Sequence, residues 1–193
     1  MPVTEILESV RQWKLGGKPG NLRAMNHYTE NSGYNLFCQK NGKFFTTLKV
    51  PLGINLGYTS DASLKKIHFK LPDGVEREVL SGEPVAFGVG GGEEFMRYAH
   101  RNVGVNLKWS AKPVFEWRIF GANTQAGKPI PTGALLAIVN VKVEPKPDFF
   151  VHVDRPPGMA DVGWTTSPMF LNNLISGIDL QKIKTAADVV ALL

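Results

Sequence analysis

The sequence predicts an all-β domain made of three copies of one unit. Three segments share a pattern in which a glycine precedes Asn or Asp, an apolar residue, Gly or Lys, an aromatic residue, and Thr or Ser. They span residues 53–59, 104–110 and 158–165, and their glycines stand 51 and 54 positions apart. A phenylalanine precedes each glycine by nine positions. A repeat of about fifty residues indicates a supersecondary unit that buries its apolar face against its copies.

Each copy divides into four short segments with strand character. Apolar and polar residues alternate at 68–71 and 116–119, which is typical of a strand with one buried face. Turn-forming residues separate the segments, as at Asn41-Gly42 and at the glycines 90–92. The twelve predicted strands lie at 22–28, 34–39, 43–49, 54–58, 66–71, 84–89, 94–99, 105–109, 115–120, 134–141, 148–153 and 161–164.

Three such units are too few for a β-propeller, which closes with about four or more blades. The threefold pattern over residues 20–167 resembles the β-trefoil superfamily, in which three four-stranded units surround a pseudo-threefold axis and close a short barrel. The resemblance implies a β-trefoil domain at 20–167 in which the first and last strands meet, so that no sheet edge stays exposed. It implies no single activity, because trefoil lectins, growth factors, actin-bundling proteins and protease inhibitors share the architecture.

Both ends of the chain are predicted to be short helical extensions outside the repeat, at 1–19 and 168–193. Ile6, Val10 and Trp13 share one face of the predicted N-terminal helix. Near the C-terminus, a Thr-Ala-Ala-Asp run has the spacing of a capping box at the start of a helix. We expect the two helices to pack on the outside of the β-domain or on each other.

The composition is that of an ordinary globular protein, with 43% hydrophobic and 20% charged residues among 193. The formal charge is +5, but twelve of the 22 Lys and Arg residues precede position 101 and no basic run exceeds Lys65-Lys66. This spread predicts no nucleic-acid partner. No apolar run approaches the roughly 20 residues of a membrane span, and the N-terminus lacks a signal-peptide pattern. We therefore expect no membrane partner and a cytoplasmic or leaderless secreted protein, whose oligomeric state stays open.

Patterns typical of catalysis or metal binding are missing, which favours a protein that is not an enzyme and has no cofactor. The single cysteine, Cys38, excludes an internal disulfide and a cysteine zinc site. The four histidines share no register and have no neighbouring pair of carboxylates, so no metal site is expected. The glycine-rich tract at 88–92 precedes another predicted strand and not a helix, which indicates a hairpin turn and not a phosphate loop.

The repeated segment supplies the candidate ligand-binding residues. Each copy combines a hydrogen-bonding side chain with an aromatic ring. A saccharide needs both, because its hydroxyls require directional polar partners while its C–H face packs on a ring. The candidates are Asn55, Tyr58, Asn106, Trp109, Asp161 and Trp164. A structural role is the alternative, in which the polar side chain fixes a tight bend and the ring fills the core.

From this pattern we expect a lectin-like protein that binds a carbohydrate or a glycoprotein through pseudo-equivalent pockets of the three units. The Gln-any-Trp motif of ricin-type trefoil lectins does not occur, so the resemblance selects no subfamily. The alternative is a protein-interaction module, of inhibitor or scaffold type, with the long connectors 73–81 and 122–132 on its surface.

Basic and aromatic residues also alternate at 97–101 and follow a related order at 151–155. Such segments could contact an anionic sugar or phosphate, or could form the solvated face of a strand.

Overall fold

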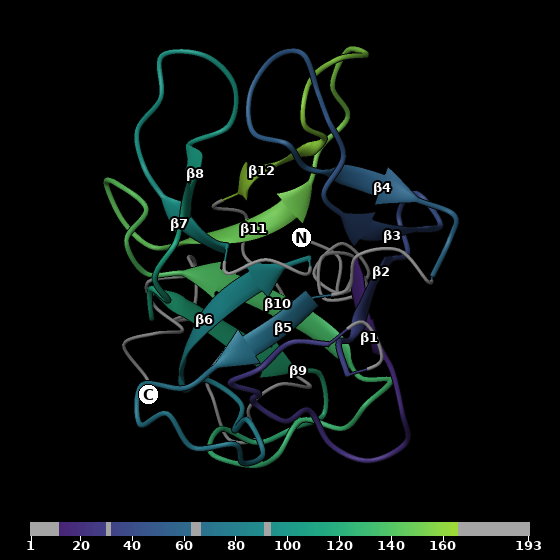
Figure 1. The fold of residues 1–193 in the computed structure, drawn as a ribbon, viewed down its shortest axis with the longest axis vertical. Coiled ribbons are helices and arrows are strands. Elements are labelled where there is room, and N and C mark those ends of the chain that lie inside the picture. Colours follow the sequence, from purple (N-terminus) through teal and green to yellow (C-terminus); the bar gives the residue numbers. More distant parts are fainter. Residues whose placement is uncertain (1–11, 30–31, 63–66, 91–93, 166–193) are drawn as a thin grey trace, which may run out of the picture.

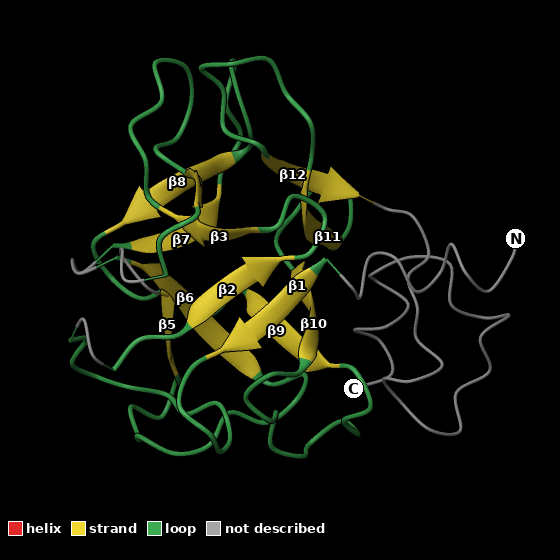
Figure 2. Cartoon of the chain, turned by 90° about the vertical axis from the view of Figure 1, so that its right-hand side faces the viewer, coloured by secondary structure: helices red, strands yellow, loops and turns green. Residues whose placement is uncertain are grey.

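The computed structural model describes residues 12–29, 32–62, 67–90 and 94–165. Within these residues it contains twelve β-strands and no α-helix, which confirms the predicted all-β class (Figures 1 and 2). The strands are β1 (Trp13–Gly16), β2 (Asn35–Cys38), β3 (Lys43–Thr46), β4 (Gly57–Thr59), β5 (Ile67–Lys70), β6 (Pro84–Val89), β7 (Phe95–Tyr98), β8 (Leu107–Ser110), β9 (Trp117–Gly121), β10 (Leu135–Asn140), β11 (Asp148–His152) and β12 (Val162–Thr165).

The start of the β-structure differs from the prediction. Trp13, which the sequence pattern assigns to a helix face, begins β1, where Trp13 and Leu15 are buried and Lys14 between them is exposed. This period of two is that of a strand. The predicted strand at 22–28 is a loop with isolated bridges. The rest of the predicted N-terminal helix and all of the predicted extension at 168–193 lie outside the described residues.

Antiparallel pairing follows chain order inside each third of the molecule. β1–β4, β5–β8 and β9–β12 each form a series of paired neighbours, which we name unit 1, unit 2 and unit 3. Between units, β10 pairs with β1, and β6 pairs with β9. Two backbone hydrogen bonds of 2.8 Å link Tyr34, just before β2, to Ile67 at the start of β5. The first two strands of each unit are thus joined in turn from β1 through β2, β5, β6, β9 and β10 back to β1.

The last two strands of each unit form a hairpin, and the three hairpins lie at one end of the molecule, which we call the hairpin end (Figure 1). There the repeated glycines Gly53, Gly104 and Gly158 have φ angles of 103°, 82° and 90°. A Cβ atom on Gly104 would lie 3.1 Å from the Cα atom of Gly53. The N–H of Leu52 donates to the carbonyl of Gly158 at 3.1 Å. The repeat therefore has glycine where three backbones approach closely at positive φ.

At the opposite end, the connectors between the first two strands of each unit meet at three buried residues. The N–H of Leu22 donates to the carbonyl of Ile130 at 2.8 Å, and the N–H of Val79 donates to that of Leu22 at 2.8 Å. The N–H of Ile130 completes the cycle by donating to the carbonyl of Val79 at 3.3 Å. All three residues are fully buried. The expectation that the connectors 73–81 and 122–132 lie wholly on the surface is wrong at Val79 and Ile130, because these side chains close the core.

Two tryptophans connect the core to the hairpins of neighbouring units. Trp13 in unit 1 donates from Nε1 to the carbonyl of Phe150 in unit 3 at 3.0 Å. Trp117 in unit 3 donates in the same way to the carbonyl of Met96 in unit 2 at 2.7 Å. Both indoles are buried, and the Phe150 ring lies parallel to Trp13 and edge-on to Trp117. Each bond satisfies a buried donor with a carbonyl of another unit, so the units are interlocked.

Two buried titratable groups make stability depend on pH in opposite directions. Burial raises the pKa of Asp148 to about 6, although its carboxylate accepts the N–H of Phe149 at 3.1 Å. Burial, with a smaller effect of Lys70, lowers the pKa of His68 to about 4. His68 is packed so tightly that a Cβ atom on Gly88 would clash with its ring. Below pH 6.5 the protonation of His68 therefore opposes folding, whereas that of Asp148 favours it.

We expect Asp148→Asn to raise the melting temperature at pH 7.5 and to lose this advantage near pH 4. The folded-state pKa of Asp148 lies above the unfolded value of about 4. The stabilisation from protonated Asp148 is therefore complete below pH 4 and is lost as pH rises through 6. Asparagine keeps the acceptor for Phe149 without the charge. In the variant, His68 dominates, so stability should fall steeply between pH 6.5 and 4. Thermal melts at pH 4, 5, 6 and 7.5 measure both effects; a constant difference across this range would contradict the assignment.

Candidate functional site

The two asparagines of the repeat fix the loops of the hairpin end. The Oδ1 atom of Asn55 accepts the N–H of Val50 at 3.3 Å, and that of Asn106 accepts the N–H of Arg101 at 2.9 Å. Each bond closes the bend that contains the repeat glycine. This geometry favours the structural interpretation for both residues. Their contact with a ligand stays a prediction.

The three aromatic residues of the repeat, Tyr58, Trp109 and Trp164, are partly buried and pack against the core. The Tyr58 ring lies 6.1 Å from that of Trp13 at an interplanar angle of 16°. The Trp164 ring lies 5.8 Å from that of Trp117 at 24°. The rings therefore extend the core toward the surface, as the structural alternative expects. Being partly exposed, they can still form the wall of a site.

Two of these rings also contact the neighbouring unit at equivalent positions. The ring of Tyr58 in unit 1 lies edge-on to His152 in unit 3, with centroids 5.1 Å apart. The ring of Trp164 in unit 3 lies edge-on to Tyr98 in unit 2, at 6.1 Å. His152 and Tyr98 each stand three positions after the repeat phenylalanine. At the junction of units 1 and 3, the smaller imidazole takes the place of a phenol ring, and a pocket opens there.

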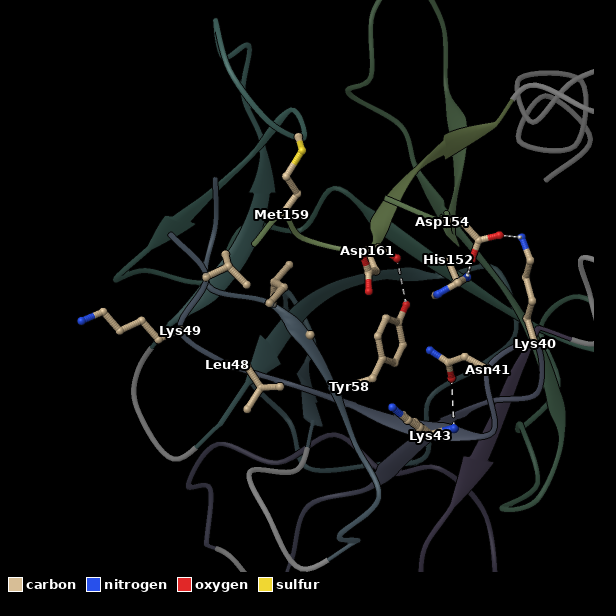
Figure 3. Close-up of a pocket in the computed structure, with 13 residues that line it drawn as sticks. Lys40, Asn41, Lys43, Leu48, Lys49, Tyr58, His152, Asp154, Met159 and Asp161 are labelled. Atoms are coloured by element: carbon tan, nitrogen blue, oxygen red, sulfur yellow. Dashed lines mark hydrogen bonds and ion pairs between the residues drawn. The ribbon is translucent and has the colours of Figure 1, made fainter. Parts of the chain in front are cut away.

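This junction pocket has a volume of about 460 Å³ and lies between β3–β4 of unit 1 and β11–β12 of unit 3 (Figure 3). Tyr58 and Asp161, two of the predicted binding residues, line it together although they belong to different units. The other four predicted residues, Asn55, Asn106, Trp109 and Trp164, do not line it. Its polar lining is Lys40, Asn41, Lys43, Lys49, Tyr58, His152, Asp154 and Asp161.

His152 contributes a buried nitrogen to the pocket. Its side chain is 6% exposed, and Nδ1 has no hydrogen-bond partner among the described residues. The nearest carboxylate oxygen, from Asp154, is 4.0 Å away, beyond hydrogen-bond distance. Burial and then Lys40 lower the pKa of His152, while Asp154 and Asp161 raise it less. The imidazole is therefore neutral at pH 7 and can donate or accept one further hydrogen bond.

The ring of Tyr58 forms an apolar wall of the pocket, and its hydroxyl already has a hydrogen-bond acceptor. Its O–H donates to the backbone carbonyl of Asp161 at 3.4 Å, across the junction of the units. Burial raises the pKa of Tyr58 well above its usual range, with smaller contributions from Cys38 and Asp161. The phenol therefore stays protonated at physiological pH. This leaves the carboxylate of Asp161 as an acceptor in the pocket.

A turn between β2 and β3 brings cationic and amide groups to the other side of the pocket. Asn41 accepts the N–H of Lys43 through Oδ1 at 3.0 Å, which holds the turn. Lys40 Nζ lies 4.0 Å from Asp154 Oδ2, and the side chains of this pair are 46% and 88% exposed. An ion pair this exposed contributes little free energy, so an incoming ligand can replace either partner.

The pocket offers hydrogen-bond donors, acceptors and an aromatic wall, which together suit a small polyhydroxylated ligand. In the described part of the chain, no three His, Cys, Asp or Glu side chains are grouped so that they could hold a metal ion. No described helix is long and apolar enough to cross a bilayer. No protein-family model matches the chain, and comparisons with curated proteins and with solved structures found no significant similarity.

Sequence reasoning identified only part of this pocket. His152 and Asp154 fall in the 151–155 segment, whose mixture of basic and apolar residues is visible in the sequence. Lys40 and Lys43 flank the predicted turn Asn41-Gly42, but a turn with lysines beside it is common on protein surfaces. The sequence does not predict that units 1 and 3 meet at this place, because the turn at Asn41-Gly42 is more than a hundred residues from His152.

Proposed function

We propose that this protein is a non-catalytic binding protein of β-trefoil architecture, and that it binds a carbohydrate in the junction pocket. Three observations support the trefoil arrangement. They are the successive pairing of six strands around the units, the cycle of hydrogen bonds through Leu22, Ile130 and Val79, and the meeting of Gly53, Gly104 and Gly158. Each relates three chain segments that occupy the same place in the sequence repeat.

The observation that supports binding best is the meeting of Tyr58 and Asp161 beside His152, whose Nδ1 atom has no hydrogen-bond partner in the described part of the chain. A buried polar atom without a partner costs free energy, and a ligand hydroxyl would remove that cost. The Asp161 carboxylate can accept hydrogen bonds from sugar hydroxyls, and the Tyr58 ring supplies an apolar wall for sugar C–H groups. The junction pocket lies between units 1 and 3, whereas the repeat alone suggests three pseudo-equivalent pockets, one in each unit.

The test is a glycan-array screen followed by calorimetric titration of the best ligand. We expect one site per chain. Asp161→Asn should weaken binding about tenfold or more, because a hydrogen bond to a charged acceptor contributes more than one to a neutral acceptor. The melting temperature should stay nearly unchanged, since Asn occupies this position in units 1 and 2.

Glu94→Gln, an equally conservative change at an exposed site that does not line the pocket, is the matched control and should bind like the parent. Failure of every glycan to bind the folded parent would overturn the proposal. So would equal affinities of Asp161→Asn and the parent.

A protein-interaction module is the second candidate, favoured by exposed apolar side chains at the hairpin end. Leu52 and Val103 are 53% and 58% exposed, and each directly precedes one of the two glycines whose backbones touch. The connectors 73–81 and 122–132 suit this role less well, because Ser81 and Lys128 hydrogen-bond to each other. This second candidate would be favoured if the unchanged protein bound no glycan on the array but bound a protein partner.

A further inference from the structure

Cationic and anionic groups both line the junction pocket. Lys40, in the β2–β3 turn, and Lys43, at the start of β3, lie on one side with Asp154 near Lys40, whereas Asp161 lies beside Tyr58 (Figure 3). Lys49 also lines the pocket. No described carboxylate oxygen lies within 4 Å of Lys43 Nζ, and Lys40 has only the loose contact with Asp154. A ligand that satisfies both sides must place an anionic group near the lysines and hydroxyl donors near Asp161.

We propose that the saccharide bound by the junction pocket is acidic, with one carboxylate facing Lys40, Lys43 and His152 and its hydroxyls facing Asp161. This inference rests on the proposed function and specifies the ligand class of the same site. A uronic acid residue has this distribution of groups. A neutral sugar would leave Lys43 without an anion, whereas a saccharide with several anionic groups would place one of them against Asp161.

Asp154 occupies the place where the ligand carboxylate would enter. Its two oxygens lie 4.0 Å from Lys40 Nζ and 4.0 Å from His152 Nδ1, so it approaches both groups without hydrogen-bonding to either. The side chain is 88% exposed and can turn into solvent. A ligand carboxylate held at closer range would make the charge-assisted hydrogen bonds that Asp154 does not make.

The imidazole of His152 makes this preference depend on pH. The charged and titratable groups around it are Lys40, Asp154 and Asp161, with the Tyr58 ring against its edge. The free imidazole is neutral because its pKa is lowered. A carboxylate bound beside Nδ1 favours the protonated form, so binding takes up a proton from solvent. Affinity should then rise as pH falls from 7.5 to 5.5, where a uronic acid stays ionised with a pKa of about 3–4.

The experiment is calorimetric titration with the methyl uronides of glucose, galactose and mannose, each beside its neutral methyl glycoside. We expect at least one uronide to bind about tenfold more tightly than its neutral counterpart at pH 6. Its affinity should rise about threefold or more between pH 7.5 and 5.5. Lys43→Gln should remove most of the preference, whereas Lys128→Gln, an exposed lysine that does not line the pocket, should keep it.

His152→Gln should keep the preference for uronides but lose the pH dependence, provided that its circular dichroism is native. Lys43 is exposed, so its variant tests the inference even if the His152 variant does not fold. Equal binding of uronides and neutral glycosides would overturn the acidic ligand and leave the proposed function intact. Binding of acetate as tightly as a uronide would indicate an anion site without saccharide recognition and would overturn both. Failure of all six glycosides, together with a blank glycan array, would also overturn both.

Discussion

Trp117→Ala should destabilise the protein by about 3–5 kcal/mol, the usual cost of removing a large side chain from a core. Trp117 is fully buried, and its ring contacts Phe87, Phe150 and Trp164. The substitution also leaves the carbonyl of Met96 without its donor. At about 2–4 °C per kcal/mol for a chain of this size, the melting temperature should fall by roughly 6–20 °C.

Trp109→Ala is the matched comparison, because the same side chain there is only partly buried. It should cost about 1–2 kcal/mol, in keeping with the smaller apolar area removed from water. Chemical denaturation of the two variants measures both values. Equal losses would contradict the difference in burial between the two side chains, and a near-zero loss for Trp109→Ala would show that its ring does not stabilise the core.

Gly104→Ala should cost about 2–4 kcal/mol, because two unfavourable effects combine. The φ of 82° is costly for any residue with a Cβ atom, and the new Cβ would press on the backbone of Gly53 at 3.1 Å. Backbone cannot move aside as the end of a side chain can. The hairpin end should therefore loosen, and the melting temperature should drop by roughly 5–15 °C.

Gly127→Ala separates the two effects. Its φ of 78° is nearly the same, but a Cβ atom there would meet no atom of the described residues within 4 Å. This control should lose only about 1–2 kcal/mol, from the backbone conformation alone. If both variants lose the same amount, the glycines of the hairpin end do not pack against each other, and the threefold arrangement loses one of its three supports.

The strands were largely predictable from the sequence, and the reason is physical. The repeat places glycine where backbones meet and an aromatic ring where the core reaches the surface, so the same constraints recur three times. The first strand was missed because Trp13 fits two periods. It follows Ile6 and Val10 at helical spacing, and it also precedes Leu15 at strand spacing. Only the pairing of β1 with β2 and β10 decides between them.

The pocket was predictable only in part. The repeat identifies Tyr58 and Asp161 as candidates, but it assigns them to separate units and thus to separate pockets. Their contact joins residues 103 positions apart, and the pairing of the units that causes it has no local pattern. The same holds for Lys40 and Asp154, whose ion pair crosses the junction. Tyr98 and His152 occupy equivalent positions. Their difference in size indicates a pocket only when it is known that Trp164 packs against Tyr98 and Tyr58 against His152.

The most direct test of the account is an amide chemical-shift map of the ¹⁵N-labelled protein during titration with the best-binding glycoside. If the junction pocket is the saccharide site, the largest saturable changes should occur at Asn41, Tyr58 and His152. The amides of Tyr98 and Trp109, outside the pocket, should stay nearly unchanged. The largest changes at Tyr98 and Trp109, with none at the junction of units 1 and 3, would contradict the account.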